Sequence, residues 1–204
     1  MKIYITRHGQ TDWNTQWKLQ GRTDIELNDF GREQARKTGE GLRKNGIKFD
    51  RVYTSPLKRA SETAGLISGF PQKDIVSDGR LIEIAFGKAE GTTSEERKSI
   101  PELEGFDNFF TAPEKYVAEE GAETFESALA RTADFWESEL KPLEKNFNNI
   151  LVVTHGGTLQ SLLLHIDHRE LRDYWKVRFP NCSMNLVSLK NGIFKMEWNS
   201  RLFY

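Results

Sequence analysis

Two histidines stand at the same kind of position in the sequence, each after an apolar run and before a glycine. The first is His8 in IYITRHG, and the second is His155 in ILVVTHGG. Glycine after the histidine lets the backbone turn sharply and approach a ligand. Because ligands of open α/β sheets bind at the carboxyl ends of the strands, we expect both imidazoles at one functional edge of a sheet.

Two arginines add positive charge to this predicted edge. Arg7 precedes His8, and Arg59 lies in SPLKRASETA, after a second predicted strand. A cation in the first turn of a helix opposes the helix dipole at a cost of roughly 0.3 to 1 kcal/mol, which favours a compensating anion beside Arg59. Arginines, imidazoles and backbone amides at strand ends form a positive pocket, and phosphate is its natural ligand.

The elements that position these residues alternate between strand and helix. We expect strands at 2–6, before and including Thr54, at the start of 148–166, at 183–190 and at 194–200. Helices are expected at 28–46, at 55–69, within 124–147 and in the second part of 148–166. Ser55 is the predicted N-cap of the second helix, with Pro56 at its first position. Between these elements, 74–87 offers two short extended pieces, of which the second could equally be an ordered loop. This alternation predicts a largely parallel sheet covered on both faces.

One segment departs from the alternation. Residues 90–120 carry charges, two prolines and an aromatic cluster without sustained periodicity, and we expect an insertion there within a single domain covering 1–204. The helix that follows has an apolar stripe at Phe125, Leu129, Ala133, Trp136 and Leu140.

Composition narrows the class of protein. Aliphatic and aromatic content is that of a folded protein, and a net charge of -1 gives no basic excess for nucleic acid. The single cysteine, Cys182, excludes an internal disulfide and a cysteine-based metal centre. The apolar run at the N-terminus is too short for a signal peptide or a membrane span, so we expect a cytoplasmic protein.

The ordered motifs resemble those of the histidine phosphatase superfamily, also called the phosphoglycerate mutase-like family. The matching segments are RHGQTDWN, SPLKRASETA, LIEIAFGKAEG, GAETFESALAR and VVTHGG, collinear over nearly the whole chain. The resemblance implies a three-layer α/β/α sandwich with a mostly parallel central sheet, and catalysis with neither a metal nor another cofactor. Two departures from the family pattern, Ala89 and Ala122, leave the subfamily open.

The resemblance also implies roles for individual residues. His8 would attack phosphorus to form a phosphohistidine, and Arg7, Arg59 and His155 would bind the phosphoryl oxygens. Glu83 would protonate the leaving alkoxide and then activate water. Hydrogen bonds from Asn14 and from the backbone at Gly156 would assist, with Gln20 and Gly21 near the substrate entrance.

Three functions are compatible with these residues. The first is a phosphomonoester hydrolase acting on a small phosphorylated metabolite, and the second is a cofactor-dependent phosphoglycerate mutase. In the insertion, Arg97, Lys98 and Lys115 stand among many acidic residues, which favours hydrolysis over a mutase that must hold a second acidic group. The third, an inactive phosphate sensor, is disfavoured because both histidines, both arginines and Glu83 are present. The sequence specifies no oligomeric state.

Other residues have two interpretations. Trp13, Trp17, Phe106, Phe109 and Phe110 could form an apolar wall beside the pocket, although ordinary packing of the insertion is the commoner role for such residues. For His165 and His168 we favour structural roles.

Overall fold

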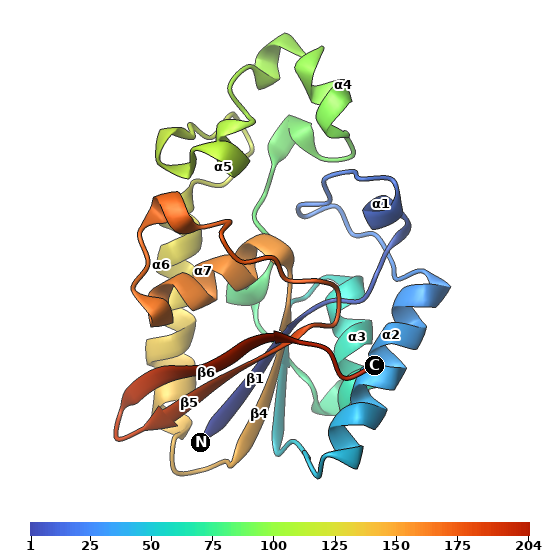
Figure 1. The fold of residues 1–204 in the computed structure, drawn as a ribbon, viewed down its shortest axis with the longest axis vertical. Coiled ribbons are helices and arrows are strands. Elements are labelled where there is room, and N and C mark those ends of the chain that lie inside the picture. The colour runs from blue at the N-terminus through green and yellow to red at the C-terminus, as the bar shows by residue number, and fades with distance from the viewer.

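Six strands form one sheet at the centre of the molecule, and the computed structural model describes all residues 1–204 (Figure 1). In spatial order the strands are β3 (Val76–Ser77), β2 (Arg51–Thr54), β4 (Asn149–Thr154), β1 (Lys2–Arg7), β5 (Met184–Lys190) and β6 (Ile193–Arg201). The first four are parallel, whereas β5 and β6 add antiparallel partners at one edge. The predicted mostly parallel sheet is confirmed.

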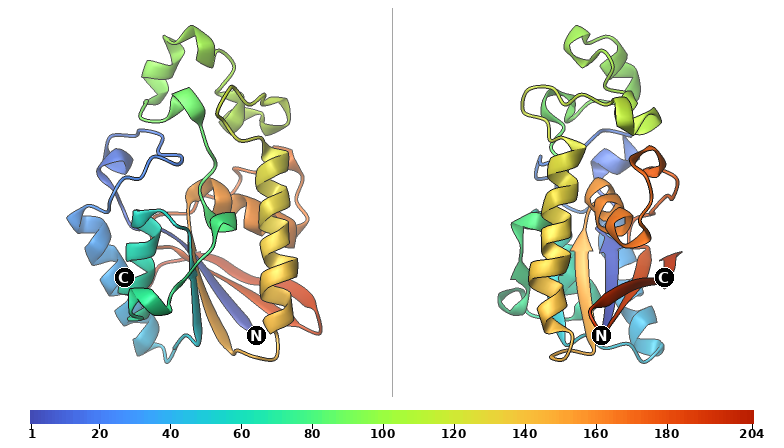
Figure 2. Two further views of the ribbon diagram at one scale, coloured as in Figure 1. Left: turned by 180° about the vertical axis from the view of Figure 1, so that it is seen from behind. Right: turned by 90° about the vertical axis from the view of Figure 1, so that its left-hand side faces the viewer.

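Helices cover both faces of the sheet, which gives the three predicted layers. On one face lie α2 (Asp29–Lys44) and α3 (Lys58–Ser68), and on the other lie α6 (Phe125–Asp134) and α7 (Gly156–Asp167). Seen edge-on, α6 and α2 are on opposite sides of the strands (Figure 2).

Alternation within the central strands explains the two cores. In β1, Ile3 and Ile5 pack toward α7 and the π-helix Phe135–Leu140 that continues α6, while Tyr4 packs toward α2 and α3. Successive strand side chains point to opposite faces, so a strand covered on both faces must be apolar throughout. The edge strand β6 instead alternates between exposed and half-buried residues.

The start of α3 differs from the prediction. The helix begins at Lys58 with Leu57 at the N-cap position, so Ser55 is not the cap and Pro56 lies before the helix. Ser55 continues the strand pairing, because its N–H donates to the carbonyl of Val153 at 3.0 Å. The first free N–H of α3, that of Lys58, is satisfied by the carboxylate of Asp24 at 2.8 Å.

The helix predicted within 124–147 is divided, and it ends in a short 3₁₀ helix at Lys141–Leu143. Residues Phe125–Asp134 are α-helical, and Phe135–Leu140 continue as a π-helix. The wider π turn shifts the buried face, so Phe135 and Trp136 are both buried although they are adjacent. Of the predicted stripe, Leu129 and Ala133 are only half-buried.

Residues 90–120 form short helices above the carboxyl ends of β1 and β4 (Figure 1). The segment includes α4 (Ser94–Lys98) and α5 (Asn108–Thr111) and has no strand. Its phenylalanines join residues of α6 and α7 in a third apolar cluster. None of the helices combines the length and hydropathy needed to cross a membrane.

Candidate active site

Strand register places the two histidines side by side. In the parallel pair β1 and β4, Arg7 lies opposite Thr154. The next residue of each strand is a histidine, so His8 and His155 are neighbours at the strand ends. Their ring centroids are 5.2 Å apart. The repeated histidine-glycine motif therefore marks two adjacent strand ends, as the sequence predicts.

The imidazole of His8 is held in one orientation. Its Nδ1 lies 2.7 Å from the carbonyl of Gly9 and must donate to it, because a carbonyl oxygen only accepts. That tautomer leaves a lone pair on Nε2, which forms no hydrogen bond with the protein. The backbone is fixed as well, since the His8 N–H donates to Thr154 and Asn181 Nδ2 donates to the His8 carbonyl.

Burial and charge keep His8 neutral. The side chain is 2% exposed, and burial, followed by the positive charges of Arg59 and Arg7, lowers the pKa of His8 well below its usual 6.5. A neutral imidazole with a free Nε2 is the form that can attack an electrophile.

His155 is buried behind the pocket rather than in its wall. Its Nδ1 accepts from Arg59 Nε at 3.2 Å, and its Nε2 lies 2.7 Å from the hydroxyl of Ser55. Burial, then the charge of Arg59, lowers the pKa of His155 well below its usual value. Both nitrogens are thus occupied by protein groups, and the predicted direct contact with a phosphoryl oxygen would require His155 to give up one of them. In this geometry the ring orients Arg59.

Arg59 reaches from α3 across the loop that carries Gly21. Its Nη2 donates to the Gly21 carbonyl at 2.6 Å, and its Nη1 donates to the Thr23 carbonyl at 2.8 Å. Burial lowers the pKa of Arg59 to about 10, so the guanidinium remains charged at neutral pH. The unfavourable position in the helix is compensated by two carbonyl oxygens.

Arg7 has a buried donor without a partner. One nitrogen, Nη1, donates to the carbonyl of Phe179 at 3.2 Å, while Nε is buried and forms no hydrogen bond. Native proteins rarely leave a buried donor unpaired, and an anion is the ligand that suits a guanidinium.

Glu83 is held by the N-terminus of α7. Its Oε1 accepts from the N–H of Ile84 at 2.9 Å and of Thr158 at 3.0 Å, and its Oε2 accepts from the N–H of Gly157 at 3.1 Å. The amides at a helix N-terminus favour a carboxylate there. A Cβ built on Gly156 would lie 3.9 Å from Oε2 and 3.7 Å from Arg7 Nε, so the carboxylate and the guanidinium meet at this glycine.

One cavity of about 230 Å³ is lined by all the predicted site residues except His155: Arg7, His8, Asn14, Gln20, Gly21, Arg59, Glu83 and Gly156. Within it, Gln20 Oε1 is buried without a hydrogen-bond partner, like Arg7 Nε. Asn14 Oδ1 accepts from the N–H of Thr11, which leaves its amide NH₂ group available to a ligand.

The structure adds lining residues that were not predicted: Lys18, Leu19, Phe86, Gly157 and Trp175. Lys18 and Leu19 could have been found from their position just before Gln20. No local pattern singles out Trp175, which reaches the cavity because its indole N–H donates to the carbonyl of Phe109 at 2.6 Å.

The loop at Gly21 is fixed by a carboxylate that the sequence analysis missed. Glu90 accepts from the N–H groups of Arg22, Thr23 and Phe86 at 3.0, 2.9 and 3.1 Å. Gly21 has φ of +51°, and a Cβ there would lie 2.0 Å from Glu90 Oε1. Glycine is therefore required by both the backbone conformation and the space.

The aromatic residues considered for a wall of the pocket lie in different environments. Phe106 and Phe109 are buried in the apolar cluster of the insertion, as ordinary packing predicts, whereas Phe110 also lines the cavity. Trp17 does neither, being 85% exposed.

The two remaining histidines lie outside the cavity. His168 ends α7 in the left-handed conformation, and His165 Nε2 lies 3.6 Å from a carboxylate oxygen of Glu137. These positions agree with the structural roles favoured for both histidines.

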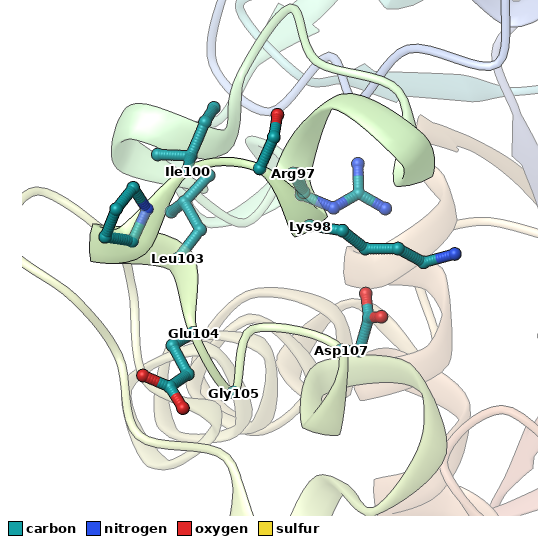
Figure 3. Close-up of a pocket in the computed structure, with 9 residues that line it drawn as sticks. Arg97, Lys98, Ile100, Leu103, Glu104, Gly105 and Asp107 are labelled. Atoms are coloured by element: carbon teal, nitrogen blue, oxygen red, sulfur yellow. The ribbon is translucent and has the colours of Figure 1, made fainter.

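A separate cavity of about 390 Å³ is lined by residues of the segment 97–107 (Figure 3). It shares no lining residue with the cavity at His8. The guanidinium of Arg97 lies 5.3 Å from the ring centre of Phe106 and donates to the Thr92 carbonyl, so it stabilises the insertion internally.

The chain is similar to known proteins over most of its length. Residues 3–200 match the model of the histidine phosphatase superfamily (branch 1). The uncharacterized phosphatase PhoE of Bacillus subtilis (strain 168) is 38% identical over 165 residues, which cover 80% of this chain and 76% of PhoE. The 2,3-bisphosphoglycerate-dependent phosphoglycerate mutase of Arthrobacter sp. (strain FB24) is 31% identical over 191 residues, 81% of this chain and 77% of the mutase.

Among solved structures, Bacillus stearothermophilus YhfR superposes with a TM-score of 0.87 at 31% identity, covering 97% of this chain and 95% of YhfR.

Proposed function

The chain belongs to the histidine phosphatase superfamily, and from this membership we propose that it hydrolyses the phosphate monoester of a small metabolite through a phosphohistidine at His8. The observation that carries the proposal is the state of His8: a neutral imidazole with a free Nε2 lines a cavity that also contains two guanidinium groups.

In the first step, His8 Nε2 donates its lone pair to phosphorus while the bond to the ester oxygen breaks. Arg7 and Arg59 stabilise the charge on the phosphoryl oxygens, and the unpaired Arg7 Nε is a donor that the ester can satisfy. Positive charge fixed in a buried site serves here the purpose that metal ions serve in other phosphoryl transfer enzymes.

Glu83 transfers the protons. Its Oε1 is used by two backbone amides, so Oε2, which lies nearer the cavity at Gly156, is the oxygen that we assign to carry the proton. It protonates the departing alkoxide, then accepts a proton from water as that water attacks phosphorus and releases His8.

The mutase is the alternative. A mutase must retain a doubly anionic intermediate while it reorients, which requires further cationic contacts. None of the predicted cations at 90–120, Arg97, Lys98 and Lys115, lines the cavity, where Lys18 is the one cation besides Arg7 and Arg59. This supports hydrolysis.

The test is the fate of the phosphoryl group. We expect His8→Ala to abolish turnover and expect rapid quenching with ³²P-labelled substrate to leave the label on His8. Label absent from the wild-type protein, or found on His155, would contradict the role of His8.

The two activities are separated by one measurement on 3-phosphoglycerate with a trace of 2,3-bisphosphoglycerate. Release of inorganic phosphate with little 2-phosphoglycerate supports the hydrolase, whereas rapid isomerisation with negligible phosphate release establishes the mutase.

A further inference from the structure

A second cavity, of about 280 Å³, opens beside the catalytic one. Arg7, Gly156 and Trp175 line both cavities. The second one lies between the first turns of α7 and the segment 175–180, and its other lining residues are Gln160, Val177, Arg178, Phe179 and Pro180.

The junction between the two cavities is at Gly156, where Glu83 Oε2 and Arg7 Nε approach the same point. Glu83 is the proposed proton donor to the leaving oxygen. Because the two cavities share Gly156 in their linings, the alcohol portion of an ester cleaved beside Glu83 has the second cavity next to it.

One residue that lines the second cavity, Gln160, has a fixed and unpaired acceptor. Gln160 is 2% exposed, and its Nε2 donates to the carbonyl of Val177 at 2.5 Å. That bond fixes the orientation of the amide, and Oε1 is left buried with no partner. A buried acceptor without a donor is destabilising, so a ligand that supplies a donor gains the corresponding interaction.

The remaining walls are apolar with one cation at the rim. Trp175, Val177, Phe179 and Pro180 supply the apolar surface, and the exposed Arg178 forms no ion pair. Such a site suits a ligand with an apolar body and polar groups at its end.

We propose that this cavity is a specificity subsite for phosphate esters whose alcohol portion has an apolar body carrying a carboxylate and a hydrogen-bond donor. The carboxylate lies at Arg178, the donor at Gln160 Oε1 and the apolar body against Trp175. The assignment rests on the proposed phosphatase function and names the substrate class of that site.

Three aryl esters with similar leaving groups test the subsite: phenyl phosphate, the phosphate ester of 3-(4-hydroxyphenyl)propanoate, and O-phosphotyrosine. They differ in having neither polar group, the carboxylate alone, or the carboxylate and an ammonium donor. We expect kcat/KM to rise along this series in the wild-type enzyme.

Two variants separate the contacts. Arg178→Gln should lower the ratio of kcat/KM for the propanoate ester to that for phenyl phosphate about fivefold, a magnitude typical of an exposed charge pair. Gln160→Met should lower the ratio for O-phosphotyrosine to the propanoate ester. The matched control is Arg172→Gln, an exposed arginine outside both cavities, which should retain the wild-type ratios.

The outcomes are distinguishable. Equal kcat/KM values for the three esters, or unchanged ratios in Arg178→Gln, would overturn the subsite and leave the phosphatase function intact. Absence of hydrolysis of every ester by folded wild-type protein would overturn both. Arg178 is exposed, so its substitution tests the proposal even if Gln160→Met fails to fold.

Discussion

A histidine can attack phosphorus only while its nucleophilic nitrogen carries no proton. His8 satisfies this condition through two independent features, the Gly9 carbonyl that holds the proton on Nδ1 and the buried positive surroundings that disfavour a second proton. Arg59 acts on both histidines. Its charge lowers the pKa of His8, and its Nε donates to Nδ1 of His155 and orients that ring.

The lowered pKa of His8 predicts the acid side of the pH profile. We expect kcat/KM to remain high as the pH falls through 6.5, because His8 stays neutral until a lower pH. The measurement is kcat/KM for phenyl phosphate between pH 4 and 8, corrected for ionisation of the substrate. If kcat/KM falls to half of its maximum at or above pH 6.5, the pKa of His8 is not lowered in the active enzyme.

The acid role proposed for Glu83 predicts a dependence on the leaving group. Glu83→Gln should reduce kcat for a sugar phosphate by about 100-fold or more, the range of general acid catalysis, and reduce that for p-nitrophenyl phosphate much less. A good leaving group needs little protonation. The matched control is Glu126→Gln, an exposed position in the first turn of α6. Equal losses for both substrates would remove Glu83 from the acid role.

At the scale of the element, the N-terminus of α7 organises the site. Its first residues supply Gly156, where Arg7 and Glu83 approach each other, the two amides that hold Glu83 and, one turn later, the side-chain amide of Gln160. Backbone amides of the helix hold the carboxylate of Glu83 in position. Larger side chains in the first turn of α7 should therefore displace it.

Gly157→Ala tests that requirement. A Cβ at this position would lie 2.9 Å from Glu83 Oε1 and 2.9 Å from Ile84 Cδ1, so the carboxylate must move. We expect kcat for a sugar phosphate to fall by at least about tenfold, because small displacements of a positioned group are costly in catalysis. Gly79→Ala is the control, since a Cβ there meets nothing within 4 Å. Unchanged kcat in Gly157→Ala would show that the position of Glu83 does not limit turnover.

At the scale of the whole molecule, folding buries two histidine side chains and favours their uncharged form. His8 and His155 are buried at the centre, and burial lowers the pKa of each. In the unfolded chain each would titrate near 6.5, so below that pH the unfolded state binds more protons than the native state.

Stability should therefore fall as the medium becomes acidic. Each histidine contributes up to about 1.4 kcal/mol of lost unfolding free energy for each pH unit below 6.5, until its native pKa is reached. Urea unfolding at pH 7.5, 6.5 and 5.5 measures this slope. The His8→Gln, His155→Gln double variant should show a flatter slope over the same range. An unchanged slope would mean that the two histidines do not carry the effect.

Several features of this protein are local properties of the sequence. The buried strands at His8 and His155, the glycines that follow them, the alternation that gives a sheet between two helical layers, and the motifs of the superfamily all depend on residues close together in the chain. Apolar periodicity and turn chemistry act between near neighbours, so they can be recognised before the structure is known.

Tertiary structure decided what depends on distant contacts. Ser55 continues its strand and contacts His155, 100 residues away, rather than capping a helix. Trp175 reaches the catalytic cavity through the backbone of Phe109, and the acceptor of Gln160 is left unpaired by its bond to Val177. A side chain with several possible partners is assigned to one only when the fold brings that partner within hydrogen-bond distance, and no local pattern encodes that choice.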